Sequence, residues 1–219
     1  AGSLLNPSRI GLCATMGHST VPVVKRLKVA IISTGDELKQ PGVELERGQI
    51  YESNSFGISG LVNWLGHTPV RMHSVGDTID DLREALNQAS TECDLILTSG
   101  GVSMGEWDLV RKIMEEEGDI HFWRVKLRPG SPPLFGKWNN TPIFGLPGNP
   151  VSSHVVFRML VAPWIRHNTL TSEPAEIMIT AKLSTKVKSS KDCLTLRRVS
   201  VERKEGLFFA SQKLSLIHI

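Results

Sequence analysis

Residues 95–108 read LILTSGGVSMGEWD, a short apolar run that passes into a glycine-rich loop and then into an acidic residue. This is the form of a buried strand followed by the loop at its carboxyl end. Residues 28–38 repeat the arrangement in KVAIISTGDEL. Because apolar runs alternate with amphipathic stretches from residue 28 to about residue 167, the pattern predicts a βαβ layer architecture with a largely parallel sheet.

The elements of this α/β unit follow from periodicity and from capping signals. Strands are predicted at 29–33, 69–74, 95–98, 121–126, 134–137 and 142–145. Helices are predicted at 55–65 with Asn54 as N-cap, after a Thr78–Asp81 capping box, at 108–117, and at 151–167 behind Pro150. The predicted fold class is therefore α/β with three layers and a largely parallel sheet, followed by a small, incomplete all-β domain, since period-two alternation appears at 176–182, 195–201 and 206–211.

Composition excludes several classes of protein. The 219 residues are 40% hydrophobic and 21% charged, which disfavours disorder. The net charge is only +3 and basic runs are absent, so we expect no nucleic-acid partner. The longest apolar stretch, 154–165, is too short to span a bilayer, and the N-terminus does not resemble a signal peptide. Widely spaced cysteines at 13, 93 and 193 offer no disulfide framework, so we expect a cytoplasmic protein.

Four strand ends carry the residues of chemical interest. In an open α/β sheet, ligands bind at the carboxyl ends of the strands. Segments 33–38, 76–77, 99–108 and 146–150 each follow a predicted strand. We therefore expect all four to open on one edge of the sheet.

The loop 99–105 has three glycines and two serines. Backbone N–H groups in such a loop can form a nest for phosphate oxygens, whereas the alternative is a tight turn that needs positive φ angles. The loop lacks the lysine of a P-loop and the spacing of a dinucleotide-binding motif. We favour an anion site of another kind.

Three acidic residues, Glu37, Asp77 and Asp108, follow different strands. Together they are typical of a Mg²⁺ site that also bridges substrate phosphates. Each also has a structural alternative: Glu37 as a solvated loop residue, Asp77 as the residue before a cap, and Asp108 as an N-cap.

Arg124, Lys126 and Arg128 alternate along the fourth strand, so they are expected to share a face. They fit either recognition of an oxyanion or protection of a strand edge by charge. The seven histidines show no metal-ligand spacing, which disfavours a zinc site.

Six motifs in register, STGDEL, GQIYESN, VGD, SGGVSMGEWD, RPGSP and LPGNPVS, resemble the molybdopterin molybdenumtransferase family, the MoeA and gephyrin E-domain proteins. The resemblance is strong over about residues 21–167 and weak over 176–211. It implies insertion of molybdenum from molybdate into adenylylated molybdopterin, with Mg²⁺-dependent release of AMP. It also implies a homodimer in the intact protein, with a molybdopterin adenylyltransferase as a possible partner.

Site residues are carried over from the matching motifs. The resemblance identifies Glu37, Asp77 and Asp108 as catalytic and metal-binding, and Pro147 and Pro150 as catalytic. Arg128 and Ser152 resemble a molybdate site to which the C-terminal domain adds Arg198. Members of the family often have lysine where this chain has Arg124, Arg128 and Ser131. The full set of expected substrate-binding residues is Thr34, Gly35, Asp36, Asn54, Ser99, Gly100, Gly101, Ser103, Gly105, Glu106, Arg124, Arg128, Ser131, Gly148, Asn149, Ser152 and Arg198.

The expected domain division is a remnant of an upstream domain with a connecting strand (1–27), a molybdopterin-binding α/β domain (28–168), and a partial C-terminal β-barrel-like domain (174–219). Two other functions fit the same residues. A molybdopterin adenylyltransferase shares the α/β domain and the glycine loop, and a scaffold module would bind molybdopterin without turnover. The motif LPGNPVS and the β unit favour the molybdenumtransferase.

Overall fold

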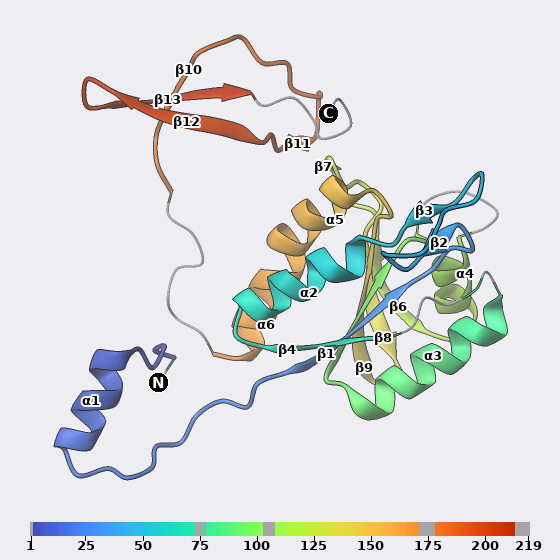
Figure 1. The fold of residues 1–219 in the computed structure, drawn as a ribbon, viewed down its shortest axis with the longest axis horizontal. Coiled ribbons are helices and arrows are strands. Elements are labelled where there is room, and N and C mark those ends of the chain that lie inside the picture. The colour runs from blue at the N-terminus through green and yellow to red at the C-terminus, as the bar shows by residue number, and fades with distance from the viewer. Residues whose placement is uncertain (1, 73–75, 77, 103–107, 171–177, 213–219) are drawn as a thin grey trace.

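The structure is a computed structural model that describes residues 2–72, 76, 78–102, 108–170 and 178–212. A six-stranded sheet forms the centre of its α/β unit (Figure 1). Strands β4, β1, β5 and β9 run parallel, and β8 runs antiparallel to both β9 and β6. The largely parallel sheet is thus confirmed. Its strands, in spatial order, are β4 (Thr68–Arg71), β1 (Lys28–Ser33), β5 (Leu95–Ser99), β9 (Thr141–Leu146), β8 (Leu134–Trp138) and β6 (Asp119–Trp123).

Helices cover both faces of this sheet, which gives the predicted three layers. Neighbouring residues of a strand point to opposite faces. Ile31 therefore packs beneath one helical layer and Ile32 beneath the other. Strand β5 is buried throughout and begins with the apolar run Leu95–Leu97, which follows from cover on both faces. One layer holds α2 (Asn54–Trp64), α5 (Pro150–Val156) and α6 (Ala162–Asn168), and the other holds α3 (Ile79–Glu92) and α4 (Leu109–Glu116).

The predicted helix 151–167 is continuous but not uniform. A π-helical turn, Phe157–Val161, joins α5 to α6. Pro163 lacks an N–H, so the α-helical hydrogen bond to the carbonyl of Met159 cannot form there. A wider turn beside such a position lets the chain remain helical through it.

The fourth strand is shorter than predicted. Strand β6 ends at Trp123, and Arg124 takes a φ of 69°. The expectation that Arg124, Lys126 and Arg128 share the face of one strand is therefore wrong, because the left-handed residue breaks the alternation. Arg128 instead belongs to the short strand β7 (Leu127–Arg128).

The N-terminal segment differs from the expected connecting strand. It contains a helix, α1 (Pro7–Thr15), capped by the side chain of Asn6. Its apolar side chains, including Ile10 and Leu12, are exposed. Residues 21–24, which the structure describes, lie outside the strands.

A small β unit follows the α/β unit, as predicted. Strands β10 (Lys182–Leu183), β13 (Leu207–Gln212) and β12 (Val199–Lys204) form one sheet. The expected strand 195–201 is interrupted, since β11 (Leu194–Thr195) pairs instead with β7 of the α/β unit. The expected strand 176–182 begins only at Lys182 in the described part. Two further short strands, β2 (Leu38–Lys39) and β3 (Ile50–Tyr51), pair beside the first strand-end loop.

Between residues 2 and 212, leaving aside the gaps given above, the chain forms no helix of the length and apolar character that a bilayer span requires.

Candidate functional site

Loops that follow β1, β5 and β9 are joined by backbone hydrogen bonds. The Thr34 N–H donates to the Ser99 carbonyl over 3.2 Å, and the Gly100 N–H donates to the Leu146 carbonyl over 3.0 Å. These three strand ends therefore lie at one edge, as expected from the parallel order.

The start of the glycine loop is tightly enclosed. Gly100 has a φ of 98°, and a Cβ there would lie 3.1 Å from the carbonyl oxygen of Thr34. Gly101 has a φ of 66°, and its Cβ would lie 3.2 Å from the Val110 nitrogen at the start of α4. The tight-turn explanation for these glycines is thus confirmed, while anion binding stays a prediction. Ser103, Gly105 and Glu106 lie outside the described residues.

Asn54 connects two of these loops through its side chain. Its Nδ2 donates to Ser99 Oγ over 2.7 Å and to the Gly148 carbonyl over 2.8 Å. The prediction that Asn54 caps α2 is wrong, because Ser53 occupies the N-cap position and Asn54 is the first helical residue. The Asn54 Oδ1 atom is buried and has no hydrogen-bond partner among the described residues.

The turn 147–150 is held by its own polar groups. Asn149 caps α5 by accepting from the Ser152 N–H over 3.1 Å, and Pro150 takes the first helical position as predicted. Ser153 Oγ donates to the carbonyl oxygens of Pro147 and Asn149. This turn is therefore held by its own hydrogen bonds where it meets the glycine loop.

Acidic side chains gather beside the loop after β1. The exposed Glu37 folds against Gly35, where a Cβ would lie 2.6 Å from Glu37 Oε2. Asp36 Oδ1 and Asp81 Oδ2 lie 3.5 and 3.4 Å from the corresponding point at Gly76.

Asp108 occupies the N-cap position of α4, as the structural alternative expected, although its side chain makes no capping hydrogen bond. Asp77 lies outside the described residues. Within the described ranges, no three His, Cys, Asp or Glu side chains are grouped closely enough to hold a metal. Hard carboxylate oxygens nevertheless suit Mg²⁺, so the side chains of Glu37 and Asp108 fit the ion chemically.

Arg128, Ser152 and Arg198 come from segments that touch. Gly130 packs against α5, since its Cβ would lie 3.4 Å from the Ser152 carbonyl oxygen. Strand β11 pairs with β7, and the Leu196 N–H donates to the Arg128 carbonyl over 2.8 Å. The tertiary structure thus brings a C-terminal arginine near the predicted molybdate site.

The pKa of His154 depends on the same arrangement of segments. Burial lowers its pKa, and the positive charges of Arg158 and Arg198 lower it further. The imidazole lies against α2, because a Cβ on Gly57 would be 2.7 Å from His154 Nε2.

Arg124 and Ser131 flank the loop before β8. The Arg124 guanidinium lies 5.3 Å from the centre of the Trp123 ring, and the Val125 N–H donates to the Ser131 carbonyl over 2.9 Å. The Trp123 indole N–H in turn donates to the Val102 carbonyl of the glycine loop over 3.1 Å.

Glu52 is a buried charged residue that sequence reasoning missed. It is 2% exposed and accepts hydrogen bonds from Ser33 Oγ and from the Ser55 N–H, over 3.0 and 2.7 Å. The signal was present in residues 52–55, ESNS, where a carboxylate that can accept a backbone N–H stands just before the start of a helix.

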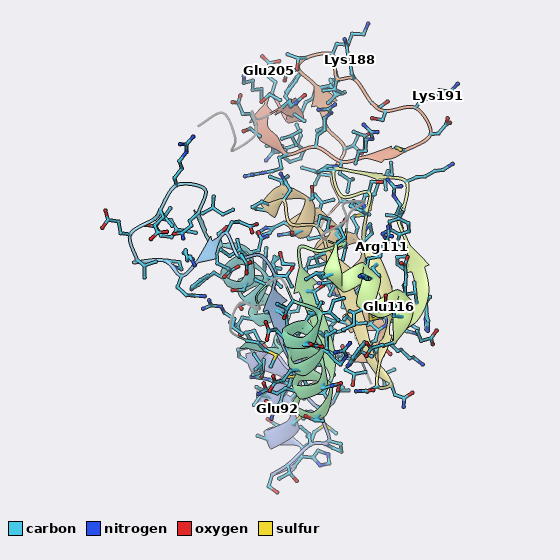
Figure 2. The ribbon with its side chains drawn as sticks, turned by 90° about the vertical axis from the view of Figure 1, so that its right-hand side faces the viewer. Glu92, Arg111, Glu116, Lys188, Lys191 and Glu205 are labelled. Carbon is cyan, nitrogen blue, oxygen red and sulfur yellow. The ribbon has the colours of Figure 1, made fainter. Side chains whose placement is uncertain are left out.

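Figure 2 shows Arg111 of α4 nearer to the C-terminal β unit than Glu92 of α3. Lys188, Lys191 and Glu205 lie in the β unit itself.

Comparisons with known proteins agree on one family. The family model described as a probable molybdopterin binding domain matches residues 30–167. The molybdopterin molybdenumtransferase of Haemophilus influenzae is 40% identical over 164 residues, which are 75% of this chain and 41% of that protein. The molybdopterin molybdenumtransferase of Bacillus subtilis is 33% identical over 211 residues, covering 96% of this chain and 49% of that protein.

The solved structures add a likeness in three dimensions. The crystal structure of the molybdopterin biosynthesis MoeA protein from Pyrococcus horikosii matches with a TM-score of 0.81 and 31% sequence identity, covering 98% of this chain and 52% of that one. The chain thus spans about half the length of the relatives that it matches.

Proposed function

This chain belongs to the probable molybdopterin binding domain family and is of the MoeA type, and on that premise we propose that it inserts molybdenum from molybdate into adenylylated molybdopterin and releases AMP. The observation that carries the proposal is the joining of three strand-end loops at one edge by Thr34, Gly100 and Asn54. Loops whose backbone is already held in place suit a ligand with a pyrophosphate linkage, because they need no reorganisation when the ligand binds.

The pterin nucleotide is assigned to the loop that begins at Ser99. Ser99, Gly100 and Gly101 lie between the β1 loop and the start of α4. Gly148 and Asn149 would border the ligand from the turn before α5, and Thr34, Gly35 and Asp36 from the β1 loop. Ser103, Gly105 and Glu106 complete the proposed set by motif.

Glu37, Asp77 and Asp108 would hold the Mg²⁺. When bound, the ion would neutralise the phosphate oxygens during hydrolysis of the adenylate. The carboxylates of Glu37 and Asp36 already lie at the edge where such a ligand would stand. Pro147 and Pro150 would keep the adjoining turn in place, since Pro150 starts α5 and the Pro147 carbonyl accepts from Ser153.

Molybdate is assigned to the junction of β7, α5 and β11. Arg128, Ser152 and Arg198 come from contacting segments there, and Arg124 and Ser131 flank the same loop. Guanidinium groups suit a tetrahedral oxyanion because they donate several hydrogen bonds in a fixed plane.

The wider setting of the reaction is part of the same proposal. We expect a homodimer in the cytoplasm that receives its adenylylated substrate from a molybdopterin adenylyltransferase. These features come from the family resemblance and from the expected absence of disulfides.

The test is release of AMP. We expect AMP to appear when the chain is incubated with adenylylated molybdopterin, molybdate and Mg²⁺, and Asp77→Ala to abolish that release. AMP release that persists unchanged in the variant would contradict the metal assignment. Binding without release at saturating Mg²⁺ and molybdate would select a scaffold module instead, and attachment of AMP from ATP to molybdopterin would select an adenylyltransferase.

A further inference from the structure

A buried carboxylate lies beside the site without a part in the proposed reaction. Glu52 follows β3 and is 2% exposed. Both of its oxygens are used: Oε1 accepts from Ser33 Oγ and from the Ser55 N–H, and Oε2 accepts from Ser55 Oγ. A buried charge persists in a folded protein when such partners compensate for the lost water.

The same carboxylate is paired with a cation. Arg71 Nη2 lies 3.7 Å from Glu52 Oε2, and Arg71 Nε donates to Ser55 Oγ over 2.8 Å. The Arg71 guanidinium also stacks 3.4 Å above the ring centre of Phe56. Glu52 therefore ties the end of β1, the first turn of α2 and the end of β4 to one point.

Asn54 lies between Glu52 and Ser55 in the chain, so its backbone is fixed by this network. A side-chain amide has two donor hydrogens. Those of Asn54 are both taken by protein acceptors, Ser99 Oγ and the Gly148 carbonyl. The side chain thus serves as a clamp between the two loops.

We propose that Glu52 is a positioning residue: it fixes the start of α2 so that Asn54 clamps the glycine loop to the turn before α5, and this clamp sets the affinity for the substrate. The substrate meant here is adenylylated molybdopterin, so this part of the inference rests on the proposed function. The clamp between the two loops does not depend on the proposed function.

Three variants separate positioning from simple stability. Glu52→Ala leaves the donors of Ser33 and Ser55 without their acceptor and Arg71 without its ion-pair partner. Glu52→Gln keeps an acceptor oxygen for Ser33 and the Ser55 N–H, and its amide can donate to Ser55 Oγ. Asn54→Ala removes the clamp and leaves the Glu52 network in place. Glu44→Ala, at an exposed glutamate in the loop between β2 and β3, is the matched control.

The first measurement is amide hydrogen exchange in the whole 219-residue chain without ligand. We expect faster exchange at 99–102 in both Glu52→Ala and Asn54→Ala, and unchanged exchange there in Glu44→Ala. If exchange at 99–102 is as slow in Asn54→Ala as in the parent, the proposed clamp is wrong. If Glu52→Ala does not fold, Asn54→Ala and Glu52→Gln still test the clamp and the positioning role of Glu52.

The second measurement is the dissociation constant for adenylylated molybdopterin. We expect it to rise about tenfold in Glu52→Ala and Asn54→Ala, to rise no further in the double variant, and to return to within about threefold of the parent in Glu52→Gln. Additive losses, or a folded Glu52→Ala that binds like the parent, overturn the positioning role. A parent chain that binds none of this ligand refutes the proposed function, while the exchange measurement still decides the clamp.

Discussion

At the residue scale, the site depends on close approach of backbone to backbone at Gly101. Its φ of 66° is left-handed, and a Cβ would lie 3.0 Å from Val110 Cγ2 and 3.2 Å from the Val110 nitrogen. Because α4 begins directly beside this position, the loop cannot move toward the helix without displacing the helix backbone. The glycine therefore sets the distance between the predicted nucleotide loop and α4.

We expect Gly101→Ala to destabilise the protein by about 1–3 kcal/mol, because it combines a left-handed backbone with a close contact to backbone. The measurement is the free energy of unfolding in urea. Gly60→Ala is the matched control: Gly60 lies within α2 with nothing within 4 Å of its would-be Cβ, so a gain of about 0.5–1 kcal/mol is expected there. Equal effects at the two positions would contradict this account of Gly101.

His67 gives the fold a pH dependence. Its Nδ1 accepts the Leu27 N–H over 3.2 Å just before β1 begins, and the ring can accept there only while it is neutral. Burial lowers the His67 pKa below the ordinary 6.5, and the charge of Arg26 lowers it further. The unfolded chain thus binds a proton at a higher pH than the folded chain does.

The contribution of His67 is therefore fully present above pH 6.5 and is lost as the pH falls below that value toward the folded pKa. We expect the free energy of unfolding to fall less steeply between about pH 7 and pH 5 in His67→Gln than in the parent. Titration of the ring by NMR, in folded protein and in urea, measures the two pKa values directly. A folded pKa at or above that in urea would refute the prediction.

At the element scale, the pairing of β7 with β11 decides whether the C-terminal unit can contribute to the site. The Leu194 N–H donates to the Lys126 carbonyl and the Leu196 N–H to the Arg128 carbonyl, each over 2.8 Å. Arg198 lies two residues beyond this short ladder. Its distance from Arg128 is thus controlled by a few backbone hydrogen bonds.

We expect Leu194→Pro to loosen the C-terminal unit and to weaken molybdate binding about tenfold, because proline removes one of those donors. Leu194→Ala keeps the N–H and is the matched control, since the leucine side chain is itself 55% exposed. Molybdate affinity is measured by calorimetry, and detachment by limited proteolysis between the two units. If both variants bind molybdate alike, the strand pairing does not position Arg198.

At the scale of the whole molecule, the α/β unit was readable from the sequence. Strands β1 and β5 contain the apolar runs Val29–Ile32 and Leu95–Leu97 because helices cover both faces of the sheet, and that burial leaves a continuous apolar signal. Thr78 and Pro150 marked helix starts correctly, because caps depend on local backbone groups that nearby residues must satisfy. Parallel strand order then required the loops after β1, β5 and β9 to meet at one edge.

Other features depend on contacts that no local pattern encodes. The end of β6 at Trp123 follows from a left-handed Arg124, and the role of Asn54 follows from acceptors 45 and 94 residues away in the chain. Burial of Glu52 exists only because β1, α2 and β4 converge on it. The sequence by itself determined the layers and the edge where the chemistry belongs, since periodicity and capping are local. Only the tertiary structure decided which side chains clamp that edge and which C-terminal strand reaches it, because hydrogen bonds between distant segments form only once the chain has folded.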